Sequence, residues 1–445
     1  GLKVYHLNDE LITLMKEKDI HNVIISPIKM KEINPLQDLS IFIENNIRIL
    51  TTPYFTNYDP DQDENTEISK IGRIESIQVE DLLERPAIDI NTNNVGAILS
   101  NQVVLVTGGA GSIGSEIVRQ IANFKPTAII LMEIAESPLH DLTIDLRRQY
   151  PHLQFVPIIA DVRDIHMVEE VFAEYHPTVI FHAAAYKHVP LMEDFPTQAI
   201  MANVLGTKNM ADMAIKYNAE RFVMISTDKA VNPTNVMGAS KRIAEIYVQS
   251  LFLKQVQKDA NCTKFITTRF GNVLGSNGSV VPFFKKQIAE GGPVTVTHPD
   301  IIRYFMTIPE ASCLVLEAAT LGEGGEIFCF DMGHPVRIAD LAKNMIRLAG
   351  YVPGKDIEIT YTGLRPGEKL YEELLNQKEI TLPTSNQKIL VAKVLEYDFD
   401  TVATQIQALI EEAKTGKVFP VVQKMKDIVP EFKSKNSVYE QLDKN

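Results

Sequence analysis

The sequence predicts an α/β protein with a doubly wound parallel sheet, a smaller C-terminal substrate lobe and a small N-terminal α/β domain. From residue 101 onward, short apolar runs alternate with amphipathic helical patterns, which is typical of parallel strands covered by helices on both faces. A glycine-rich turn joins the first of these runs to its helix, and the second run ends in a carboxylate. A chain of 445 residues is long enough for roughly two or three domains.

The chain is expected to divide into consecutive segments. In the first of them, strands are expected at 3–6, 23–26 and 47–51, with helices near 9–18 and 37–45, and the polar, acidic stretch 57–66 is expected to be a loop. In order, the segments are a small regulatory or linking α/β domain (1–75), a connecting segment (76–100), a dinucleotide-binding domain (101–275), a substrate-binding lobe (276–395, to which 265–275 can contribute strands), and a C-terminal helix at about 399–415 with a charged tail (396–445).

Composition narrows the class of protein. A net charge of −13 without a basic stripe argues against a general nucleic-acid binder. No apolar run has the roughly 18 residues that a membrane-spanning helix needs. Cys262, Cys313 and Cys329 show no metal or redox spacing, so we expect core thiols in a reducing, cytoplasmic compartment and no metal site. The chain starts at Gly1 without Met, so we expect that it is cut from a longer protein.

The glycine-rich turn predicts a dinucleotide site. Strand 103–106 ends in glycines at 108, 111 and 114, and a helical pattern follows over 116–122. Such glycines let the backbone approach a pyrophosphate, which the N–H groups of the helix N-terminus then bind. The next strand, 129–133, ends in Glu133, about 20 residues after the last glycine, where a ribose hydroxyl is expected. A glycine turn without a ligand is the alternative. A nucleoside triphosphatase is disfavoured because no Gly-Lys-Ser/Thr follows the glycines.

Later strands add residues to the predicted cofactor site. Strand 155–160 leads to Asp161, placed to meet an adenine edge, and the small residues that end strand 179–185 let a cofactor lie close. Glu133 favours NAD, while Arg147 and Arg148 on the following helix keep NADP as the alternative. The predicted cofactor-binding residues are Thr107, Gly108, Gly111, Ser112, Ile113, Gly114, Glu133, Asp161, Val162, Ala183, Ala184, Ala185 and Lys241.

A reactive triplet follows the next strand, 221–226, which precedes a further strand at 265–269. Thr227, Asp228 and Lys229 put a hydroxyl, a carboxylate and an amine at one strand end, as acid–base chemistry on a sugar carbon requires. Met237 and Lys241 are four residues apart on one face of a helix, where Lys241 could bond a nicotinamide ribose. Taken singly, these residues could be a surface ion pair and an exposed lysine. Together, at a strand end in a dinucleotide fold, they favour a catalytic site.

These residues resemble the extended short-chain dehydrogenase/reductase superfamily. Within it, the chain from about residue 100 to 375 is similar to the large, membrane-associated bacterial UDP-N-acetylglucosamine 4,6-dehydratases of polysaccharide biosynthesis. The resemblance implies a Rossmann domain, a tightly bound and regenerated cofactor, and a UDP-sugar partner. Residues 1–95 resemble only loosely the cytoplasmic unit that links such cores to transmembrane helices. The resemblance rests on the segments Ala183-Ala-Ala-Tyr-Lys-His-Val-Pro-Leu-Met-Glu193, Ser226-Thr-Asp-Lys-Ala-Val-Asn-Pro-Thr-Asn-Val-Met-Gly-Ala-Ser-Lys-Arg242, Arg269-Phe-Gly-Asn-Val-Leu-Gly-Ser-Asn-Gly-Ser279 and Arg365-Pro-Gly-Glu-Lys-Leu370.

One position departs from the superfamily pattern. The usual Tyr-x-x-x-Lys has Met237 in place of the tyrosine, and a thioether neither gives nor takes a proton. The large dehydratases share this replacement, which implies that Thr227 and Asp228 handle the proton at C4. The resemblance also implies hydride removal from C4, proton abstraction at C5 by Lys229 with a lowered pKa, donation by protonated Asp228 to the leaving C6 hydroxyl, and hydride return to C6. Which of Asp228 and Lys229 is the acid stays open, as does the stereochemistry at C5.

Polar residues further along the chain are expected to bind the UDP part of such a substrate. Asn272 and Ser279 lie in a glycine-rich segment able to present N–H groups to phosphate. Arg303 and Arg365 supply forked donors suited to a diphosphate. Arg365 could instead anchor a turn, because Pro366 follows it. The predicted substrate-binding residues are Lys187, Asn272, Ser279, Arg303, Arg365 and Glu368.

Two other functions stay open. A UDP-sugar 4-epimerase shares the first hydride step and a C5-epimerising variant uses similar residues, but Asp228 and Lys229 argue for the dehydratase. A dinucleotide sensor without turnover is supported by Met237 alone and opposed by the retained triplet and Lys241. We expect a homo-oligomer, located at the cytoplasmic face of the inner membrane if the full-length protein carries transmembrane helices.

Overall fold

The computed structural model describes residues 9–25, 41–42, 45, 47–51, 75–76, 91–373, 380–393 and 396–443. The chain forms two compact units. The smaller unit contains Gly1–Pro86, Gly278–Ile301 and Val336–Gly363, and the larger contains Ala87–Asn277, Ile302–Pro335 and Leu364–Asn445. The chain thus passes between the units several times. The consecutive domain boundaries drawn from the sequence stay predictions.

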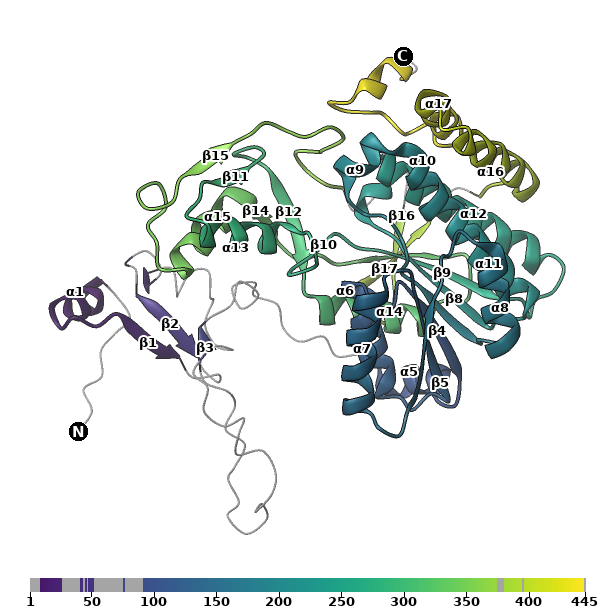
Figure 1. The fold of residues 1–445 in the computed structure, drawn as a ribbon, viewed down its shortest axis with the longest axis horizontal. Helices are drawn as coiled ribbons and strands as arrows, with labels where there is room; N and C mark the ends of the chain where they lie inside the picture. The colour runs from purple at the N-terminus through teal and green to yellow at the C-terminus, as the bar shows by residue number, and fades with distance from the viewer. Residues whose placement is uncertain are drawn as a thin grey trace, which may run out of the picture. The chain divides into compact units, whose positions relative to one another are not determined.

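The larger unit is built on one sheet of nine strands, in the order β16-β17-β13-β9-β8-β7-β4-β5-β6 (Figure 1). The seven strands from β13 to β6 are mutually parallel. This arrangement confirms the predicted doubly wound α/β class. The strands are β4 (Val103–Thr107), β5 (Ala128–Glu133), β6 (Gln154–Ile159), β7 (Val179–His182), β8 (Arg221–Ile225), β9 (Lys264–Arg269), β13 (Ile327–Phe330), β16 (Ile380–Pro383) and β17 (Ile389–Lys393).

Helices cover both faces of this sheet, and each face has its own hydrophobic core. In β4, Leu105 joins one core and its neighbours Val104 and Val106 join the other, because successive side chains point to opposite faces. The first core also contains residues of α8 (Ile165–Tyr175), α11 (Gly206–Lys216), α12 (Val236–Val256), α16 (Phe399–Lys414) and α17 (Val418–Ile428). The second contains residues of α5 (Thr92–Leu99), α6 (Ser112–Ala122), α7 (Glu136–Gln149) and α14 (Ile308–Leu321).

Shorter elements complete the larger unit. Strand β10 (Asn272–Val273) pairs in parallel with β12 (Ile302–Met306), beyond the main sheet. Strand β14 (Pro335–Arg337) begins at Pro335, the last residue of the segment Ile302–Pro335 of this unit. The remaining elements are the helices α9 (Val189–Asp194) and α10 (Pro196–Ala199), the π-helical turn η2 (Ile200–Leu205), and the 3₁₀ turns η3 (Asp228–Ala230) and η4 (Val438–Leu442).

Helix α12 is buried along most of its length because α16 packs over it. Tyr247 of α12 lies against Phe399 of α16, with ring centroids 5.8 Å apart. Inside the unit, the Glu245 carboxylate accepts hydrogen bonds from Arg269 Nε at 2.8 Å and Nη2 at 2.6 Å. Two further donors, Arg242 and the Ser226 hydroxyl, reach the same carboxylate. These bonds fix α12 to the ends of β8 and β9.

The predicted strands of this unit all form, with boundary shifts. The strand predicted over 179–185 ends at His182, because the Asn203 amide binds both the N–H and the carbonyl of Tyr186 and holds the chain away from the sheet. The helix predicted at about 399–415 is α16. The charged tail expected after it is wrong in part, because α17 forms there and buries Val421 and Met425. The main sheet was expected to be parallel, but it also includes the edge strand pair β16 and β17, and β17 runs antiparallel to β13 and to β16.

In the smaller unit, α1 (Asp9–Glu17) and the sheet β1-β2-β3 share a small core that includes Ile12, Met15 and Ile49. The predicted helix near 9–18 and the strands at 23–26 and 47–51 therefore form, whereas the strand at 3–6, most of the helix at 37–45 and the loop at 57–66 lie outside the described residues. The other elements of this unit are β1 (Asn22–Ile25), β2 (Arg48–Thr51), β3 (Glu75–Ser76), α13 (Val280–Ala289), β11 (Val294–Val296), α15 (Ile338–Leu348) and β15 (Ile359–Tyr361).

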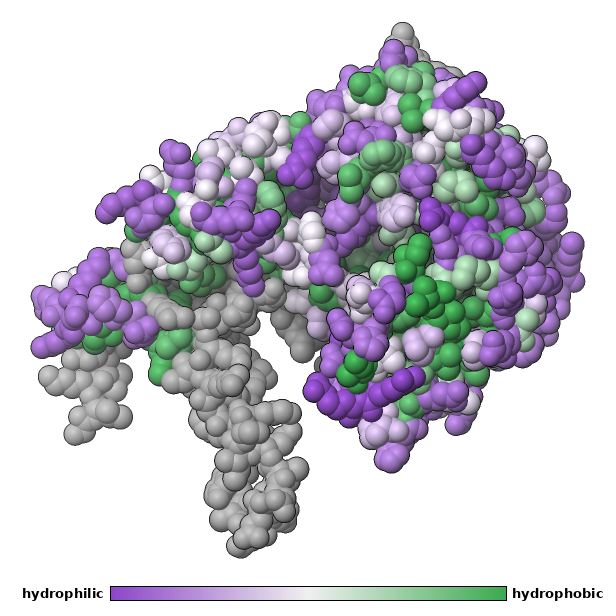
Figure 2. Space-filling model, in the orientation of Figure 1, coloured by the Kyte–Doolittle hydropathy of each residue, from purple (hydrophilic) through white to green (hydrophobic). Residues whose placement is uncertain are grey.

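The visible surface of the larger unit is mostly hydrophilic, with apolar side chains in a few patches (Figure 2). Ile134 and Ile159 are examples of apolar residues more than half exposed. None of the helices in the described residues is both long and apolar enough to cross a membrane.

We expect Leu409→Ala to lower the free energy of unfolding of the larger unit by about 3 kcal/mol, because Leu409 is fully buried where α16 covers α12. Gln405→Ala, on the exposed side of the same helix, is the matched control and should change it by less than about 0.5 kcal/mol. Urea unfolding followed by circular dichroism measures both. Equal effects of the two substitutions would mean that α16 does not pack as described.

Candidate functional site

The glycine loop lies between β4 and α6, and two of its glycines are required by space. Gly108 has a φ of +62°, and a Cβ there would lie 2.8 Å from the backbone nitrogen of Ala184. A Cβ at Gly114 would lie 2.1 Å from the carbonyl oxygen of Gly108. No side chain caps α6 at Gly111, so the first N–H groups of this helix, from Ser112, Ile113 and Gly114, face the loop without a side-chain acceptor. Such a helix end binds a phosphate well.

Glu133, at the end of β5, holds the loop that precedes α6. Its Oε2 accepts a hydrogen bond from the Ala110 N–H at 3.3 Å, and its Oε1 accepts from the Ile134 N–H at 2.9 Å and the Ala135 N–H at 3.2 Å. The arginines considered for a 2′-phosphate contact other groups. Arg147 donates to the carbonyl of Phe155 at 3.4 Å, and Arg148 pairs with Asp145 at 3.1 Å.

The remaining predicted cofactor residues line the ends of β6 and β7. Asp161 accepts hydrogen bonds from Arg163 Nε at 3.0 and 2.8 Å. Burial raises the pKa of Asp161. The hydrogen bonds and the charge of Arg163 lower it by more, so the net pKa lies below its usual value. Val162 is buried beside it. Ala183 and Ala184 donate their N–H groups to the carbonyl and the hydroxyl of Thr107, and Ala185 is exposed.

Lys241 is buried in α12, and its ammonium makes no hydrogen bond to any described residue. Burial lowers its pKa to about 8, against an opposing effect of Glu245. Nearby, the fully buried His182 lies between the hydroxyls of Thr107 at 2.8 Å and Thr207 at 2.9 Å, and burial and Lys241 lower its pKa to about 3. An unpartnered buried ammonium is costly without a ligand. Together with the glycine loop it fits a dinucleotide whose ribose hydroxyls Lys241 would bind.

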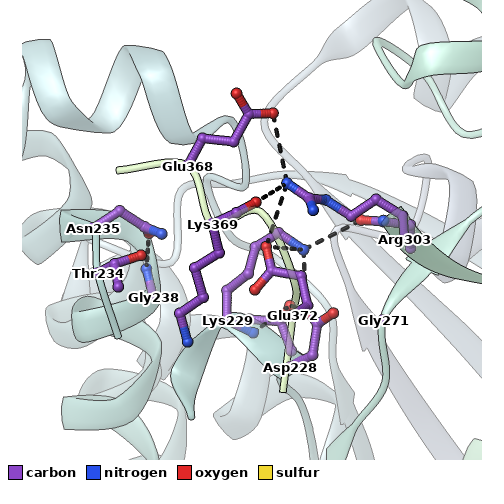
Figure 3. A network of polar contacts seen from close by, with 12 residues as sticks. Asp228, Lys229, Thr234, Asn235, Gly238, Gly271, Arg303, Glu368, Lys369 and Glu372 are labelled. Carbon is purple, nitrogen blue, oxygen red and sulfur yellow. Dashed lines mark hydrogen bonds and ion pairs between the residues drawn. The ribbon is translucent and has the colours of Figure 1, made fainter. Parts of the chain in front are cut away.

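The second part of the site is a cluster of charges around Lys229 (Figure 3). Lys229 Nζ donates to Asp228 Oδ1 at 3.0 Å and to Asn272 Oδ1 at 3.2 Å. Glu372 Oε1 lies 3.9 Å from the same Nζ and 3.8 Å from Arg303 Nη2. The side chains of Asp228 and Glu372 are only 1% and 4% exposed. The structure thus places two acidic and two basic groups in one buried cluster.

The expectation of a lowered pKa at Lys229 is wrong for this arrangement. Burial by itself lowers the pKa of Lys229, but the carboxylates of Asp228 and Glu372 raise it more, so the net pKa lies above its ordinary value. Sequence reasoning missed Glu372, which follows the segment 365–370 by two residues. Acidic residues at 372 and 373 after that segment were the available signal, but nothing in the sequence shows which of them turns inward.

The rest of the triplet and Met237 lie close to this cluster. The Thr227 hydroxyl donates to Asp228 Oδ1 at 2.8 Å, whereas the Ser226 hydroxyl points the other way, to Glu245 at 2.6 Å. Met237 is 3% exposed and packs in the first core. A Cβ at Gly238 would lie 2.1 Å from the Lys229 carbonyl oxygen, so this glycine lets η3 and α12 meet closely.

Not all predicted substrate residues reach the cluster. Arg303 donates to the carbonyls of Ile302, Leu370 and Lys369 and pairs with Glu368 at 3.5 Å. Glu368 accepts from the backbone N–H of Arg365, whose side chain is exposed. Lys187 is also exposed. Ser279 belongs to the smaller unit, where it precedes α13. In the described residues, no group of three or more His, Cys, Asp or Glu is arranged to hold a metal ion.

Comparisons with known proteins show which proteins this chain is similar to. The family model described as "Polysaccharide biosynthesis protein" matches residues 104–394. The capsular polysaccharide biosynthesis protein CapD of Staphylococcus aureus is 51% identical over 77% of this chain and 56% of its own length. A UDP-glucose 4-epimerase of Rickettsia canadensis is 36% identical over 63% of this chain and 79% of its own. The X-ray structure of Pen from Bacillus thuringiensis has a TM-score of 0.60 at 32% identity, and the match covers 66% of this chain and 90% of that one. The chain spans about half the length of the first curated relatives it matches, 56% and 54%.

We expect Lys241→Met to stabilise the protein stripped of nucleotide at pH 7 by roughly 3 kcal/mol, because the buried ammonium has a pKa of about 8 and the unfolded chain has a lysine pKa near 10.4. Between these values the unfolded state holds more protons, so wild-type stability rises with pH and the advantage of the variant shrinks. Urea unfolding at pH 7 and pH 9.5 measures this, with Lys258→Met at an exposed site as the control. An advantage that does not depend on pH would contradict the lowered pKa.

Proposed function

The chain belongs to the polysaccharide biosynthesis protein family, and on this premise we propose that it is a UDP-N-acetylhexosamine 4,6-dehydratase that uses a nicotinamide dinucleotide. The proposed reaction removes water from UDP-N-acetylglucosamine and yields UDP-2-acetamido-2,6-dideoxy-4-hexulose for polysaccharide or glycan biosynthesis. The observation that supports it most is the ion pair of Lys229 with the buried Asp228, 3.0 Å apart, beside a helix that offers a thioether where a phenol is usual.

Elimination of water from a 4-keto sugar needs a base at C5 and an acid at the C6 oxygen. We assign Lys229 as the base and Asp228 as the acid. If the ammonium first passes its proton to Asp228, a neutral amine and a neutral carboxyl arise together, with no net proton gained by the protein. Lys229 then takes the C5 proton, and Asp228 gives its proton to the leaving hydroxyl. When hydride adds to C6, Lys229 returns the proton to C5, and it regains one from solvent in place of the proton that the C4 hydroxyl released. The carboxylates of Asp228 and Glu372, which raise the pKa of Lys229, oppose this transfer.

Thr227 and Asp228 are assigned to the proton at C4. The Thr227 hydroxyl, which donates to Asp228 at 2.8 Å, would bind the C4 oxygen and relay its proton by way of the carboxylate to solvent, before Asp228 takes the proton of Lys229. The thioether of Met237 cannot do so. Its role in this proposal is to fill a core position four residues before Lys241 without adding an acid, since it is nearly fully buried.

The glycine loop, Glu133 and Lys241 would hold the cofactor. A bound nicotinamide would accept hydride from C4 and later supply it to C6. The N–H groups from Ser112 to Gly114 would bind the pyrophosphate, and Lys241 would bind the ribose next to the nicotinamide. We propose NAD, because the Glu133 carboxylate repels a 2′-phosphate and Arg147 and Arg148 contact other groups. NADP is the alternative cofactor.

For the diphosphate of the substrate, the exposed Arg365 is a better candidate than Arg303. The Arg303 guanidinium already donates to three carbonyls. The Arg365 side chain is exposed, so its guanidinium is open to a diphosphate. Asn272, Glu368 and Lys187 remain candidates for hydroxyls and phosphate. A cytoplasmic location is part of this proposal, supported by the three cysteines, which form no disulfide within the described residues.

A UDP-sugar 4-epimerase is the second candidate, favoured by the name of the Rickettsia relative. An epimerase returns hydride to C4 on the opposite face and breaks no bond at C6. The paired base and acid at Lys229 and Asp228 have no use in that reaction, which is why we favour the dehydratase. A sensor that binds the dinucleotide without turnover would need neither group.

The test is to incubate the protein with UDP-N-acetylglucosamine and NAD in heavy water and to analyse products by mass spectrometry and proton NMR. Loss of water with deuterium at C5 and a 4-keto signal is expected. A C4 stereoisomer of unchanged mass would support the epimerase. Bound NAD with no altered sugar would reject both enzymes for this substrate and favour the sensor.

We expect Lys229→Ala to lower kcat at least about 10³-fold, because the base at C5 is lost, with NAD affinity within about twofold of wild type. Lys258→Ala, at an exposed lysine, should leave both unchanged. Steady-state assays of 4-keto product and NAD titration by fluorescence measure these quantities. A Lys229→Ala protein with wild-type kcat would remove Lys229 from the mechanism.

A further inference from the structure

Glu372 turns into the charge cluster from the segment that follows Arg365 (Figure 3). Its Oε1 lies 3.9 Å from Lys229 Nζ and 3.8 Å from Arg303 Nη2, so it faces two cations without a short hydrogen bond to either. Its Oε2 is buried and has no hydrogen-bond partner among the described residues. The neighbouring Glu373 points outward and accepts from Asn232 at 2.8 Å.

Such a carboxyl group lowers the stability of the fold unless its charge serves a function. An unpartnered, buried polar oxygen destabilises a fold, because it gives up its hydrogen bonds to water and gains none in return. Burial and Asp228 raise the pKa of Glu372, against the lowering effects of Lys229, Arg303 and Lys369. These are the charged groups that face Glu372: Asp228 and Lys229 from η3, Arg303 from β12, and Lys369 on its own segment. Glu372 can therefore exist as a carboxylate or as a carboxyl group, and the choice changes the field at Lys229.

We propose that Glu372 is a positioning residue that sets how firmly Lys229 holds its proton. An ionised Glu372 stabilises the Lys229 ammonium and opposes transfer of its proton to Asp228. A neutral Glu372 removes that attraction, while Arg303 still favours loss of a positive charge nearby. The proton then moves across the 3.0 Å contact from Lys229 to Asp228. No proton leaves the cluster in this step.

The consequence for catalysis rests on the proposed function, whereas the effect on Lys229 does not. In the dehydratase, Glu372 would set the share of the Lys229–Asp228 pair that holds a neutral amine, and with it the pH range in which the rate is high. In a protein of any other activity, Lys229 would still be a weaker base without Glu372. The two statements can therefore be tested separately.

The experiment compares wild type with Glu372→Gln, which keeps the side-chain shape and removes the charge. Trace acetylation by acetic anhydride, followed by peptide mass spectrometry between pH 7 and 10, reports the amine fraction of each lysine. We expect Lys229 to react about tenfold faster in the variant at pH 8, which corresponds to a fall of its pKa by about one unit. The kcat profile for UDP-N-acetylglucosamine should shift by about one unit toward acid, with KM within about twofold.

Glu373→Gln is the matched control, since the adjacent carboxylate is 49% exposed and should leave Lys229 reactivity and the profile unchanged. Lys241 and the exposed Lys258 serve as internal standards, because unfolding would speed acetylation at every lysine. Should Glu372→Gln unfold, Glu372→Asp keeps the charge and should react as wild type does. Unchanged Lys229 reactivity in a folded Glu372→Gln protein, or equal acceleration in Glu372→Asp, overturns the inference. Changed reactivity without turnover of the sugar in any variant would support the inference and reject the proposed function.

Discussion

The site depends on the buried carboxylate of Glu245. It lies in the middle of α12 and accepts two short hydrogen bonds from Arg269 at the end of β9 and one from Ser226 at the end of β8. Breaking such a buried pair by removing one partner typically costs about 3–5 kcal/mol. The hydrogen bonds of Glu245 therefore fix the position of α12 along the strands of the sheet. One turn earlier on the same face of the helix is Lys241, and two residues after Ser226 is Asp228. One ion pair thus fixes both parts of the candidate site.

This arrangement gives two lysines of one site opposite properties. Burial lowers the pKa of Lys241 to about 8, because the nearest carboxylate, Glu245, already serves Arg269 and Arg242. The pKa of Lys229 lies above its ordinary value, because the carboxylates of Asp228 and Glu372 both face its ammonium. Groups whose environments move their pKa values apart commonly divide the binding and acid–base roles of a site. On this argument Lys241 suits a neutral ribose, and Lys229 suits proton transfer within a charged cluster.

The sequence predicts the parallel part of the sheet well, because each buried strand is a short apolar run and the glycine loop has a fixed spacing. It does not predict the hairpin of β16 and β17, since an antiparallel edge strand and a parallel one share the same apolar composition. It misses α17 because Lys417, Lys424 and Lys426 make that segment look like a solvated tail, although Lys426 is buried and bonded to Asp443 and Ser434. Glu372 is missed for a related reason. Whether a charged residue is buried depends on partners more than 60 residues away, such as Arg303 at 3.8 Å.

The C-terminal segment also shows why the loop from Arg365 to Glu372 has its present position. The carbonyl of Gly367 accepts from the Thr234 hydroxyl at 2.9 Å and from the Asn235 amide at 3.1 Å, and its N–H donates to the carbonyl of Lys435 at 2.7 Å. Gly367 has a φ of +76°, and a Cβ there would lie 2.4 Å from the Asn235 Cβ, so only glycine allows this contact. The loop from Arg365 to Glu372 is therefore held between the start of α12 and the last residues of the chain. The C-terminal segment, which the sequence predicts to be a charged tail, thus helps to hold the loop that carries Glu372 beside Lys229.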